Sequence, residues 1–370
     1  MAEWVERKIS DIGTVVGGAT PSTKKPENYE DGKIAWITPK DLSTFSGRYI
    51  ERGERNITEI GLKSCSTQLL PPNTVLFSSR APIGYVAITA NEVCTNQGFK
   101  SVIPNENTDP LFLFYLLKYN KDKIEGMGSG TTFKEVSGNT MKNIVVNVPT
   151  DKKVQEKIAA ILGSIDDKIE ENEQINNNLE QQTQAIYSRM FIEHRQESWS
   201  TGQLSDLISV KYGKDHKKLA DGNYPVYGSG GIIRYVEKPL HTGESVLIPR
   251  KGTLNNVIYV NEAFWSVDTM FYTEMLHPNI AKFVYHFVKS KDLASLNAGS
   301  AVPSMTTNIL NAMQLYIPDE KTLEKFENIV SPMYSAMQEN TKESKILANT
   351  RDTLLPKLMS GELDVSDIDL

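Results

Sequence analysis

The chain has 370 residues, of which 39% are hydrophobic and 23% are charged, and its formal net charge is −6. This length allows two globules of about 100 to 150 residues each plus long helices. Two cysteines, Cys65 and Cys94, exclude a disulfide scaffold and indicate a reducing compartment. No apolar run approaches the roughly 18 residues of a membrane span. No secretory signal pattern opens the sequence, so a cytoplasmic location is expected.

The first predicted domain covers residues 1–150, where short apolar strands alternate with polar loops. A loop punctuated by Pro and Gly leads into IAWIT, a strand that buries Trp36, and NTVLFSSRAPIG (73–84) is a strand that ends in a second loop. At such loops Arg can bond guanine or phosphate, and Asn and Gln can read adenine. The alternative is that these residues cap their own turns. The candidate DNA contacts are Thr20, Ser22, Lys24, Lys25, Lys40, Ser78, Ser79, Arg80, Asn96, Gln97 and Lys134.

A long helix is predicted over residues 151–197, directly after Pro149. Apolar residues recur at the a and d positions of a heptad counted from Ile158, which is typical of a helix that buries one seam against a partner helix. Asn172 occupies an a position near the middle. The predicted seam residues are Ile158, Leu162, Ile165, Ile169, Asn172, Leu179 and Ile186.

The second predicted domain covers residues 198–318 and contains YPVYGSGG, a loop around RKG and the segment FWSVDT. The glycines after Tyr227 resemble a phosphate cradle but lack its GK[ST] end, so a tight turn is the better interpretation. The candidate DNA contacts are Lys214, Tyr227, Ser229, Arg234, Arg250, Lys251, Asn255, Asn256, Ser266 and Asp268.

A second long helix is predicted over residues 319–360, followed by an acidic tail, 361–370. Shifting the first heptad by 168 residues gives matching apolar and polar positions. Pro332 predicts a kink or a break, because proline inside a helix costs about 3 kcal/mol. The predicted seam residues are Phe326, Val330, Met333, Met337, Asn340, Leu347 and Leu354.

The segments that flank the helices repeat as well, so the layout is domain, helix, domain, helix. FLFYLLKYNKDK (112–123) matches KFVYHFVKSKDL (282–293), and each predicts a short amphipathic helix. NTVLFSSRAPIG matches ESVLIPRKGTLN (244–255), which predicts that Arg80 and Arg250 lie in matching loops. One chain with two such long helices can close an intramolecular coiled coil.

The negative charge lies on the helices and the tail, whereas the two domains carry net charges of +1 and +2. This distribution permits contact with phosphate. Nucleotide-loop, GxSxG, HExxH and metal-ligand cysteine patterns are not found, so no catalytic residue and no metal site is predicted. Asp166-Asp167-Lys168 matches part of a nuclease acidic motif, but salt bridges on a helix surface are the better interpretation. A binding protein is therefore favoured over an enzyme.

GGATPSTKKPENYEDGKIAWITPKDL, LLPPNTVLFSSRAPIGYVAI, TNQGF, PVYGSGG, the RKG loop with FWSVDT, and both helix starts together resemble type I restriction–modification specificity subunits. The resemblance covers essentially the whole chain in the family's order. It implies a non-catalytic subunit in which each domain recognises one half of a split DNA target. It further implies that the helices set the spacer and bind two methyltransferase subunits, and that restriction subunits join through the complex. S-adenosylmethionine, ATP and Mg are then expected on the partner subunits, with no cofactor on this chain.

The fold class that we predict is α+β: two mixed α/β target-recognition domains related by an internal pseudo-two-fold and joined by two long helices in an antiparallel coiled coil. Asn172 and Asn340 are expected to pair at the middle of the seam or, alternatively, to face solvent there. Two functional alternatives remain at this point. One is an enzyme with a cryptic nuclease or transferase site, and the other is a coiled-coil scaffold whose domains bind protein.

Overall fold

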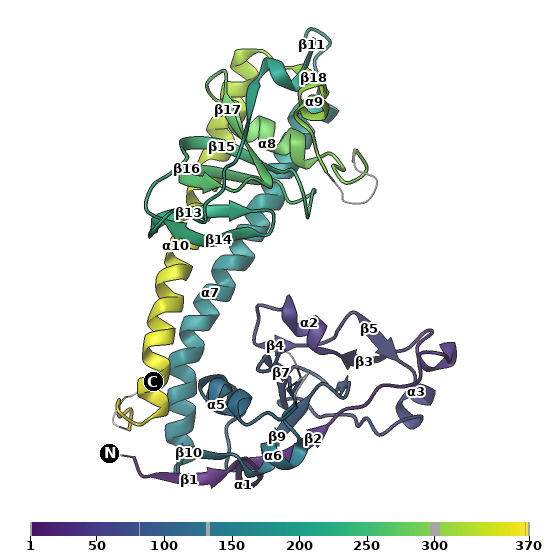
Figure 1. Ribbon diagram of the computed structural model, residues 1–370, viewed down its shortest axis with the longest axis vertical. Helices are drawn as coiled ribbons and strands as arrows, with labels where there is room; N and C mark the ends of the chain where they lie inside the picture. Colours follow the sequence, from purple (N-terminus) through teal and green to yellow (C-terminus); the bar gives the residue numbers. More distant parts are fainter. Residues whose placement is uncertain (1, 81, 131–133, 297–303, 367, 369–370) are drawn as a thin grey trace. The chain divides into compact units, whose positions relative to one another are not determined.

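The structure is a computed structural model that describes residues 2–80, 82–130, 134–296, 304–366 and 368. It divides into two compact units. Unit 1 comprises Met1–Glu173 and Thr341–Leu370, and unit 2 comprises Gln174–Asn340. Each unit therefore holds one domain and part of each long helix (Figure 1).

The domain of unit 1 is built on a five-stranded sheet of order β2-β9-β6-β7-β4, in which β4 and β7 are parallel and the other neighbours antiparallel. These strands are β2 (Gly13–Gly17), β4 (Tyr49–Ile50), β6 (Val75–Phe77), β7 (Val86–Thr89) and β9 (Lys100–Pro104). A smaller sheet has the order β5-β3-β8, with β3 (Ile34–Ile37), β5 (Arg55–Ile57) and β8 (Cys94–Thr95). A third pairs β1 (Trp4–Lys8) with β10 (Val145–Pro149). The helices are α1 (Ile9–Ile12), η1 (Pro26–Asn28), α2 (Pro39–Ser43), α3 (Glu59–Lys63), α4 (Pro110–Tyr119), α5 (Lys121–Gly126) and α6 (Gly138–Asn143).

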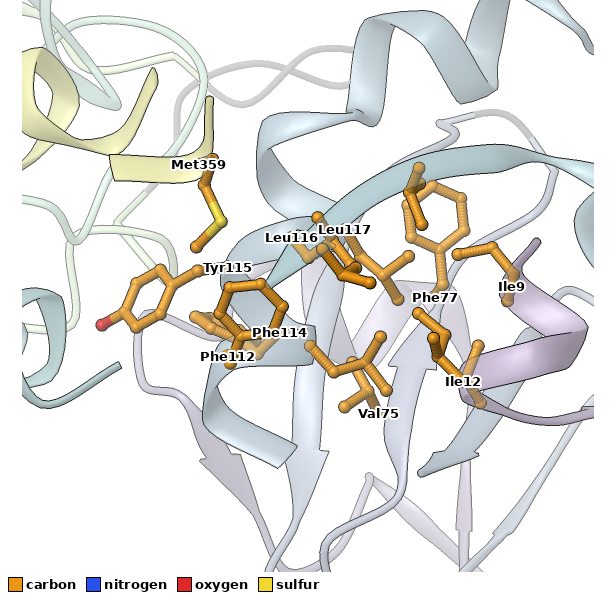
Figure 2. Close-up of a cluster of buried hydrophobic side chains, with 14 of the residues drawn as sticks. Ile9, Ile12, Val75, Phe77, Phe112, Phe114, Tyr115, Leu116, Leu117 and Met359 are labelled. Atoms are coloured by element: carbon orange, nitrogen blue, oxygen red, sulfur yellow. The ribbon is translucent and has the colours of Figure 1, made fainter. Parts of the chain in front are cut away.

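Helix α4 lies inside the core of unit 1, and the prediction of an amphipathic helix here is wrong. Its six residues from Phe112 to Leu117 are all buried. Figure 2 shows Phe112 and Phe114 gathered with Val75 of the sheet, whereas Tyr115 points toward Met359. A helix that is apolar all round needs partners on every side, and the long helices supply the second partner.

The domain of unit 2 carries a six-stranded sheet of order β12-β17-β15-β16-β13-β14, in which β13 and β16 are parallel. Its strands are β12 (Ile208–Tyr212), β13 (Asp221–Gly228), β14 (Gly231–Val236), β15 (His241–Pro249), β16 (Ile258–Ser266) and β17 (Met270–Met275). A second sheet pairs β11 (Ser200–Gln203) with β18 (Gln314–Ile317). The short helices are η3 (Leu204–Asp206), α8 (Ala281–Lys289) and α9 (Thr307–Asn311). Helix α8 is also buried from Ala281 to Val288, but unlike α4 it is amphipathic as predicted, because Lys282, His286 and Lys289 share one polar face.

The two long helices are α7 (Lys152–Tyr187), which continues as a π-helical turn (Ser188–Glu193), and α10 (Glu320–Met359). Within unit 1, Asn172 Nδ2 donates to Ser344 Oγ at 3.2 Å. Within unit 2, Asn340 Nδ2 donates to Asn176 Oδ1 at 2.9 Å. In unit 1 Asp166 also binds Arg351, and in unit 2 Tyr187 also contacts Phe326. Within each unit residue numbers therefore rise along one helix as they fall along the other, so the predicted antiparallel pair is confirmed.

Helix α10 is not broken at Pro332. Pro332 is exposed, as is Asn328 one turn earlier, whose carbonyl loses its helical partner. Solvent can therefore supply the missing hydrogen bond, which is why this proline does not end the helix.

The predicted seam is most tightly packed at the outer ends of the helices. Ile158 and Leu162 are buried in the core of unit 1, and Phe326 and Val330 are buried in the core of unit 2. Asn172 is also buried, which contradicts the alternative that it faces solvent. The remaining predicted seam residues are half-buried: Ile165, Ile169, Leu179, Ile186, Met333, Met337, Asn340, Leu347 and Leu354. The seam is thus apolar at its ends and polar near its centre.

Candidate DNA-binding surface

In unit 1 the loop after β2 crosses the end of β8 at very short range. The amide of Ala19 donates to the Thr95 carbonyl at 3.0 Å, and Trp36 Nε1 donates to the Ala19 carbonyl at 3.1 Å. A Cβ on Gly18 would lie 2.2 Å from the carbonyl oxygens of Thr95 and Asn96, so only glycine fits there. This crossing fixes the start of the loop that carries Thr20, Ser22, Lys24 and Lys25.

A second loop of unit 1, which follows β6, joins the first at the same end of the sheet. The Ser79 amide donates to the Gly98 carbonyl at 2.7 Å, and the Val136 amide donates to the Ser79 carbonyl at 2.9 Å. The next residue, Arg80, forms an isolated β-bridge with Glu135, and its Nε lies 3.0 Å from Glu135 Oε2. The Arg80 side chain remains 45% exposed. We call the loops around Thr20, Arg80 and Gln97 the unit 1 platform.

Unit 2 builds the first crossing in the same way. The Lys214 amide donates to the Ser266 carbonyl and Trp265 Nε1 donates to the Lys214 carbonyl, both at 2.8 Å. A Cβ on Gly213 would lie 2.0 Å from the Val267 carbonyl oxygen. Gly213-Lys214 therefore takes the place that Gly18-Ala19 takes in unit 1.

The second loop is also repeated in unit 2. The Arg250 amide donates to the Thr269 carbonyl at 2.8 Å, and the Met305 amide donates to the Arg250 carbonyl at 2.9 Å. The next residue, Lys251, forms an isolated β-bridge with Ser304. We call the loops around Lys214, Lys251 and Asp268 the unit 2 platform.

Arg80 and Arg250 lie in matching loops, as predicted, but one residue apart in the shared geometry. The backbone position of Arg80 in unit 1 is that of Lys251 in unit 2, and Arg250 corresponds to Ser79. The side chain of Arg250 lies within its platform: Nη1 donates to the Asp268 carbonyl at 3.2 Å, and the guanidinium lies 5.5 Å from the centre of the Tyr212 ring. Arg250 is half-buried, whereas Arg80 and Lys251 are exposed.

Four of the predicted contact residues are buried, so their side chains are removed from the candidate surface: Ser78, Ser79, Tyr227 and Ser266. The Ser78 hydroxyl accepts from the Tyr85 amide and donates to the Pro82 carbonyl, which closes its own turn. The Tyr227 hydroxyl donates to Glu262 at 2.6 Å, and burial, followed by this carboxylate, raises the pKa of Tyr227. Polar residue type in a loop segment does not by itself indicate exposure.

The other predicted contacts reach the surface. Those that are exposed are Thr20, Ser22, Lys24, Lys25, Lys40, Arg80, Gln97, Lys134, Lys214, Lys251, Asn255 and Asp268. Those that are half-buried are Asn96, Ser229, Arg234, Arg250 and Asn256.

Several of these side chains already bond partners within their own domain. Asn96 Oδ1 accepts from the Gly98 amide at 2.9 Å, Asn256 Nδ2 donates to the Ser229 carbonyl at 2.8 Å, and Arg234 binds Asp221 at 2.8 Å. Asn255 donates to Asp292, and this bond lowers the pKa of that carboxyl. Lys40 binds Glu54, which raises the pKa of Lys40. The interpretation that a loop residue caps its own turn is supported for Asn96 alone, because Asn255 and Asn256 bond residues 37 and 27 positions away along the chain.

Sequence reasoning missed two residues of the platforms, Glu135 and Tyr212. Glu135 binds Arg80 and also lies 3.5 Å from Lys100 Nζ, and it directly follows the candidate Lys134. Tyr212 is exposed beside Arg250 and precedes Gly213. Aligning the two loops on Gly18 and Gly213 would have drawn attention to Tyr212, because the glycines mark the crossing.

The segment Asp166-Asp167-Lys168 on α7 forms salt bridges, which is the interpretation that the sequence favoured. Asp166 accepts from the Tyr115 hydroxyl and from Arg351 Nη1, both at 2.6 Å, and Asp167 binds Arg48. Lys168 pairs with Glu171 at 2.9 Å. Among the residues that the structure describes, no group of three His, Cys, Asp or Glu side chains could hold a metal ion. Within the same residues, no helix has the length and apolarity needed to cross a membrane.

Two mixed α/β domains that present the same loop platform, joined by long antiparallel helices, define a repeated, modular recognition protein. A model of the type I restriction modification DNA specificity domain matches residues 1–181 and again residues 196–347. The chain therefore belongs to the type I restriction–modification DNA specificity family, and the family resemblance and fold class inferred from sequence are confirmed.

Individual relatives agree with this placement. The chain is 30% identical to the specificity subunit of type I restriction enzyme MjaIX from Methanocaldococcus jannaschii, over 99% of this chain and 95% of that protein. It is 22% identical to the EcoprrI specificity subunit from Escherichia coli, over 89% and 88%. The fold is similar to the crystal structure of a type I restriction–modification S subunit from M. genitalium, with a TM-score of 0.64 at 19% identity, covering 99% of this chain and 97% of that one.

Proposed function

We propose that this chain is the non-catalytic DNA-recognition subunit of a type I restriction–modification complex and that each platform binds one half of a bipartite duplex target. The observation that carries the proposal is the repeated platform. In a chain of this family, the same two backbone crossings present exposed polar and basic loops in both domains. Two domains that each recognise a DNA half-site need the same geometry in their surface loops, and not only in their cores.

The exposed cations divide by the contact that each can make. Lysine is a point charge suited to phosphate, so Lys24, Lys25, Lys214 and Lys251 are assigned to the DNA backbone. The planar guanidinium of Arg80 suits bidentate bonds to guanine O6 and N7. Its partner Glu135 contacts Nε, and the Arg80 side chain as a whole remains 45% exposed. Phosphate contacts then position each domain, and Arg80 contributes to sequence selection.

The partners and cofactors follow from the same assignment. Two copies of a methyltransferase subunit bind the helices, and restriction subunits join through the complex. S-adenosylmethionine, ATP and Mg are bound by those subunits and not by this chain. The helices set the spacer between the half-sites, and the complex acts on DNA in the cytoplasm. The sequence of this family member supports that arrangement through its domain–helix repeat.

The test is methylome sequencing of a host that expresses this chain with its methyltransferase partner. We expect one bipartite motif with a single spacer length. Replacing residues 1–150 by the first domain of another family member should change one half of that motif and leave the other half intact. A change in both halves, methylation by the isolated chain, or binding of protein instead of duplex DNA would each overturn the assignment.

A further inference from the structure

In unit 1 the domain is attached to α7 by a buried arginine that nothing in the sequence singled out. Arg48 lies just before β4, and only 7% of its side chain is exposed. Its Nε donates to Glu170 Oε1 at 3.0 Å and its Nη2 to Glu170 Oε2 at 3.2 Å, which forms a bidentate pair. Nη2 also binds Asp167, and Nη1 donates to the Gly163 carbonyl at 3.3 Å. Every nitrogen of the guanidinium is thus bonded to α7.

The contact continues along one stripe of α7. Ser46 Oγ donates to Glu173 Oε2 at 3.3 Å, so the segment before β4 contacts three carboxylates spaced by three residues. A spacing of three residues keeps side chains on one face of a helix. Burial by itself lowers the pKa of Arg48, but the hydrogen bonds from Glu170 and Asp167 more than compensate and raise it. The guanidinium therefore stays charged in its buried place.

A glycine inside α7 makes this approach possible. A Cβ on Gly163 would lie 3.3 Å from Arg48 Nη1 and 3.1 Å from Leu111 Cδ2. Glycine is unfavourable in a helix interior relative to alanine, so its presence at the contact has a packing reason. Helix α7 thus has no side chain at the position where Arg48 and the core of the domain pack against it.

The backbone of Arg48 is connected to the unit 1 platform. Its carbonyl accepts from the Ile88 amide of β7 at 2.7 Å. Strand β7 pairs with β6, through Phe77 opposite Val86, and β6 leads directly into the loop that carries Arg80. The sheet therefore joins Arg48 to the platform through continuous backbone hydrogen bonds. We therefore expect a change in the contact between Arg48 and α7 to alter the orientation of the unit 1 platform.

We propose that Arg48 is a positioning residue that fixes the orientation of the first domain on α7 and so determines which spacer length the subunit accepts. The proposal rests on the proposed function. An apolar contact is non-directional, whereas a bidentate guanidinium–carboxylate pair has a set geometry. Loss of the bidentate pair between Arg48 and Glu170 lets the first domain take more than one orientation on α7. The loops of the unit 1 platform are not altered by this loss. The half-site sequence is then kept, and the tolerance for spacer length widens.

The experiment uses the full chain reconstituted with its methyltransferase partner. Its substrates are a set of plasmids that carry the wild-type half-sites. In these plasmids the half-sites are separated by the native spacer, or by a spacer that is one or two base pairs longer or shorter. The variants are Arg48→Lys, Arg48→Met and Gly163→Ala. Lys168→Ala is the matched control, because the Lys168–Glu171 pair lies on α7 alone. Methylation of each plasmid is read by sequencing, and melting temperatures show that each variant is folded.

We expect methylation at the native spacer to fall about tenfold in the Arg48 variants, since misplacement of reacting groups by about 1 Å can cost a hundredfold in rate. Plasmids with spacers one base pair longer or shorter should gain methylation, with the half-site sequences unchanged, and Lys168→Ala should behave as wild type. A folded Arg48→Met that keeps a single sharp spacer overturns the proposal. So does an equal loss at all spacers, which is the mark of a structural role alone.

A second measurement does not depend on DNA. Spin labels at Asn91 of the domain and Glu156 of α7, both exposed and both in unit 1, give a distance distribution by pulsed electron resonance in a chain with Cys65 and Cys94 replaced. We expect a narrow distribution in the otherwise wild-type chain and a broader one in Arg48→Met. An unchanged width overturns the positioning role. If the wild-type complex methylates no bipartite site, the proposed function fails, and the label distances still decide whether Arg48 fixes the domain.

Discussion

Arg80 and Lys251 occupy the same backbone position in the two domains. Each residue follows one whose amide binds the start of a neighbouring strand, and each forms a β-bridge with the segment that precedes the last short helix of its domain. The two side chains differ in how strictly they can recognise a base, since the planar guanidinium presents donors in a fixed geometry whereas the ammonium is a point charge on a flexible stem. On the proposed function, we expect the same position in the two half-sites to be recognised with different stringency.

The first prediction compares these two residues. Arg80→Ala should cost about 1–3 kcal/mol on the specific site and relax sequence preference at one position of one half-site. Lys251→Ala should weaken binding to all sequences. It should also reduce by about one the slope of the logarithm of the binding constant against the logarithm of the salt concentration. Fluorescence anisotropy against a set of single-base variants at several salt concentrations measures both effects. If Arg80→Lys retains full selectivity, the contact of Arg80 is with phosphate.

The second prediction concerns the glycine crossings. Gly18→Ala should destabilise the protein by about 1–3 kcal/mol, because the new methyl meets two backbone carbonyls that cannot move aside cheaply. Gly17→Ala is the matched control, since its nearest neighbours lie 4.0 Å from the added Cβ. Urea unfolding reports the difference. Equal stability of the two variants would show that the crossing is loose.

The sequence predicted the long helices and the repeat well. Heptad periodicity is a local pattern along the chain, so it can be read without knowing which distant residues pack against the helix. It predicted the platforms less well. Ser78 and Arg80 lie two residues apart in one polar stretch, yet Ser78 is buried and Arg80 is exposed. Which of them faces solvent depends on the pairing of Ser79 with Gly98 and Val136, residues distant in sequence. Arg48 was missed for the same reason, because its carboxylate partners lie 119 and 122 residues away along the chain.

The third prediction concerns pH. His286 is fully buried, its Nδ1 is 2.8 Å from Gln184 Oε1 and its Nε2 is 3.0 Å from the Tyr334 hydroxyl, and burial lowers its pKa to about 4. The folded protein thus binds fewer protons at this site than the unfolded chain between pH 6.5 and 4. Stability should be full above pH 6.5 and fall as pH is lowered through that window, by about 3 kcal/mol in total.

Replacing the imidazole tests this assignment. His286→Gln should be less stable than wild type at pH 7.5 but should lose less of its stability between pH 6.5 and 4. His277→Gln, at an exposed site, should keep the wild-type slope. Denaturant unfolding at several pH values gives the comparison. A wild-type pH dependence in His286→Gln would assign the slope to other groups.

The last prediction concerns the polar centre of the seam. Asn172 is buried, and its Nδ2 lies 2.8 Å from Glu343 Oε2 as well as 3.2 Å from Ser344 Oγ. Asn340 binds Asn176, and Asn176 also donates to the Met337 carbonyl at 3.2 Å. In each unit an a position of one helix thus meets a d position of the other. The direct pairing of Asn172 with Asn340 joins different units and stays a prediction.

Hydrogen-bonded amides at the polar centre of a seam can fix register, because a slip would leave the buried Asn172 and the half-buried Asn340 without these bonds, at a cost of about 1–3 kcal/mol for a buried amide. Replacing Asn172 and Asn340 with Leu removes that penalty for slipped alignments and adds apolar burial. We expect a higher melting temperature together with a less sharply defined spacer in the methylated target. Gln182→Leu, which alters an exposed residue of α7, is the control and should leave the spacer unchanged. A double variant that is no more stable and methylates a single spacer would show that register is set elsewhere, by the apolar ends of the seam.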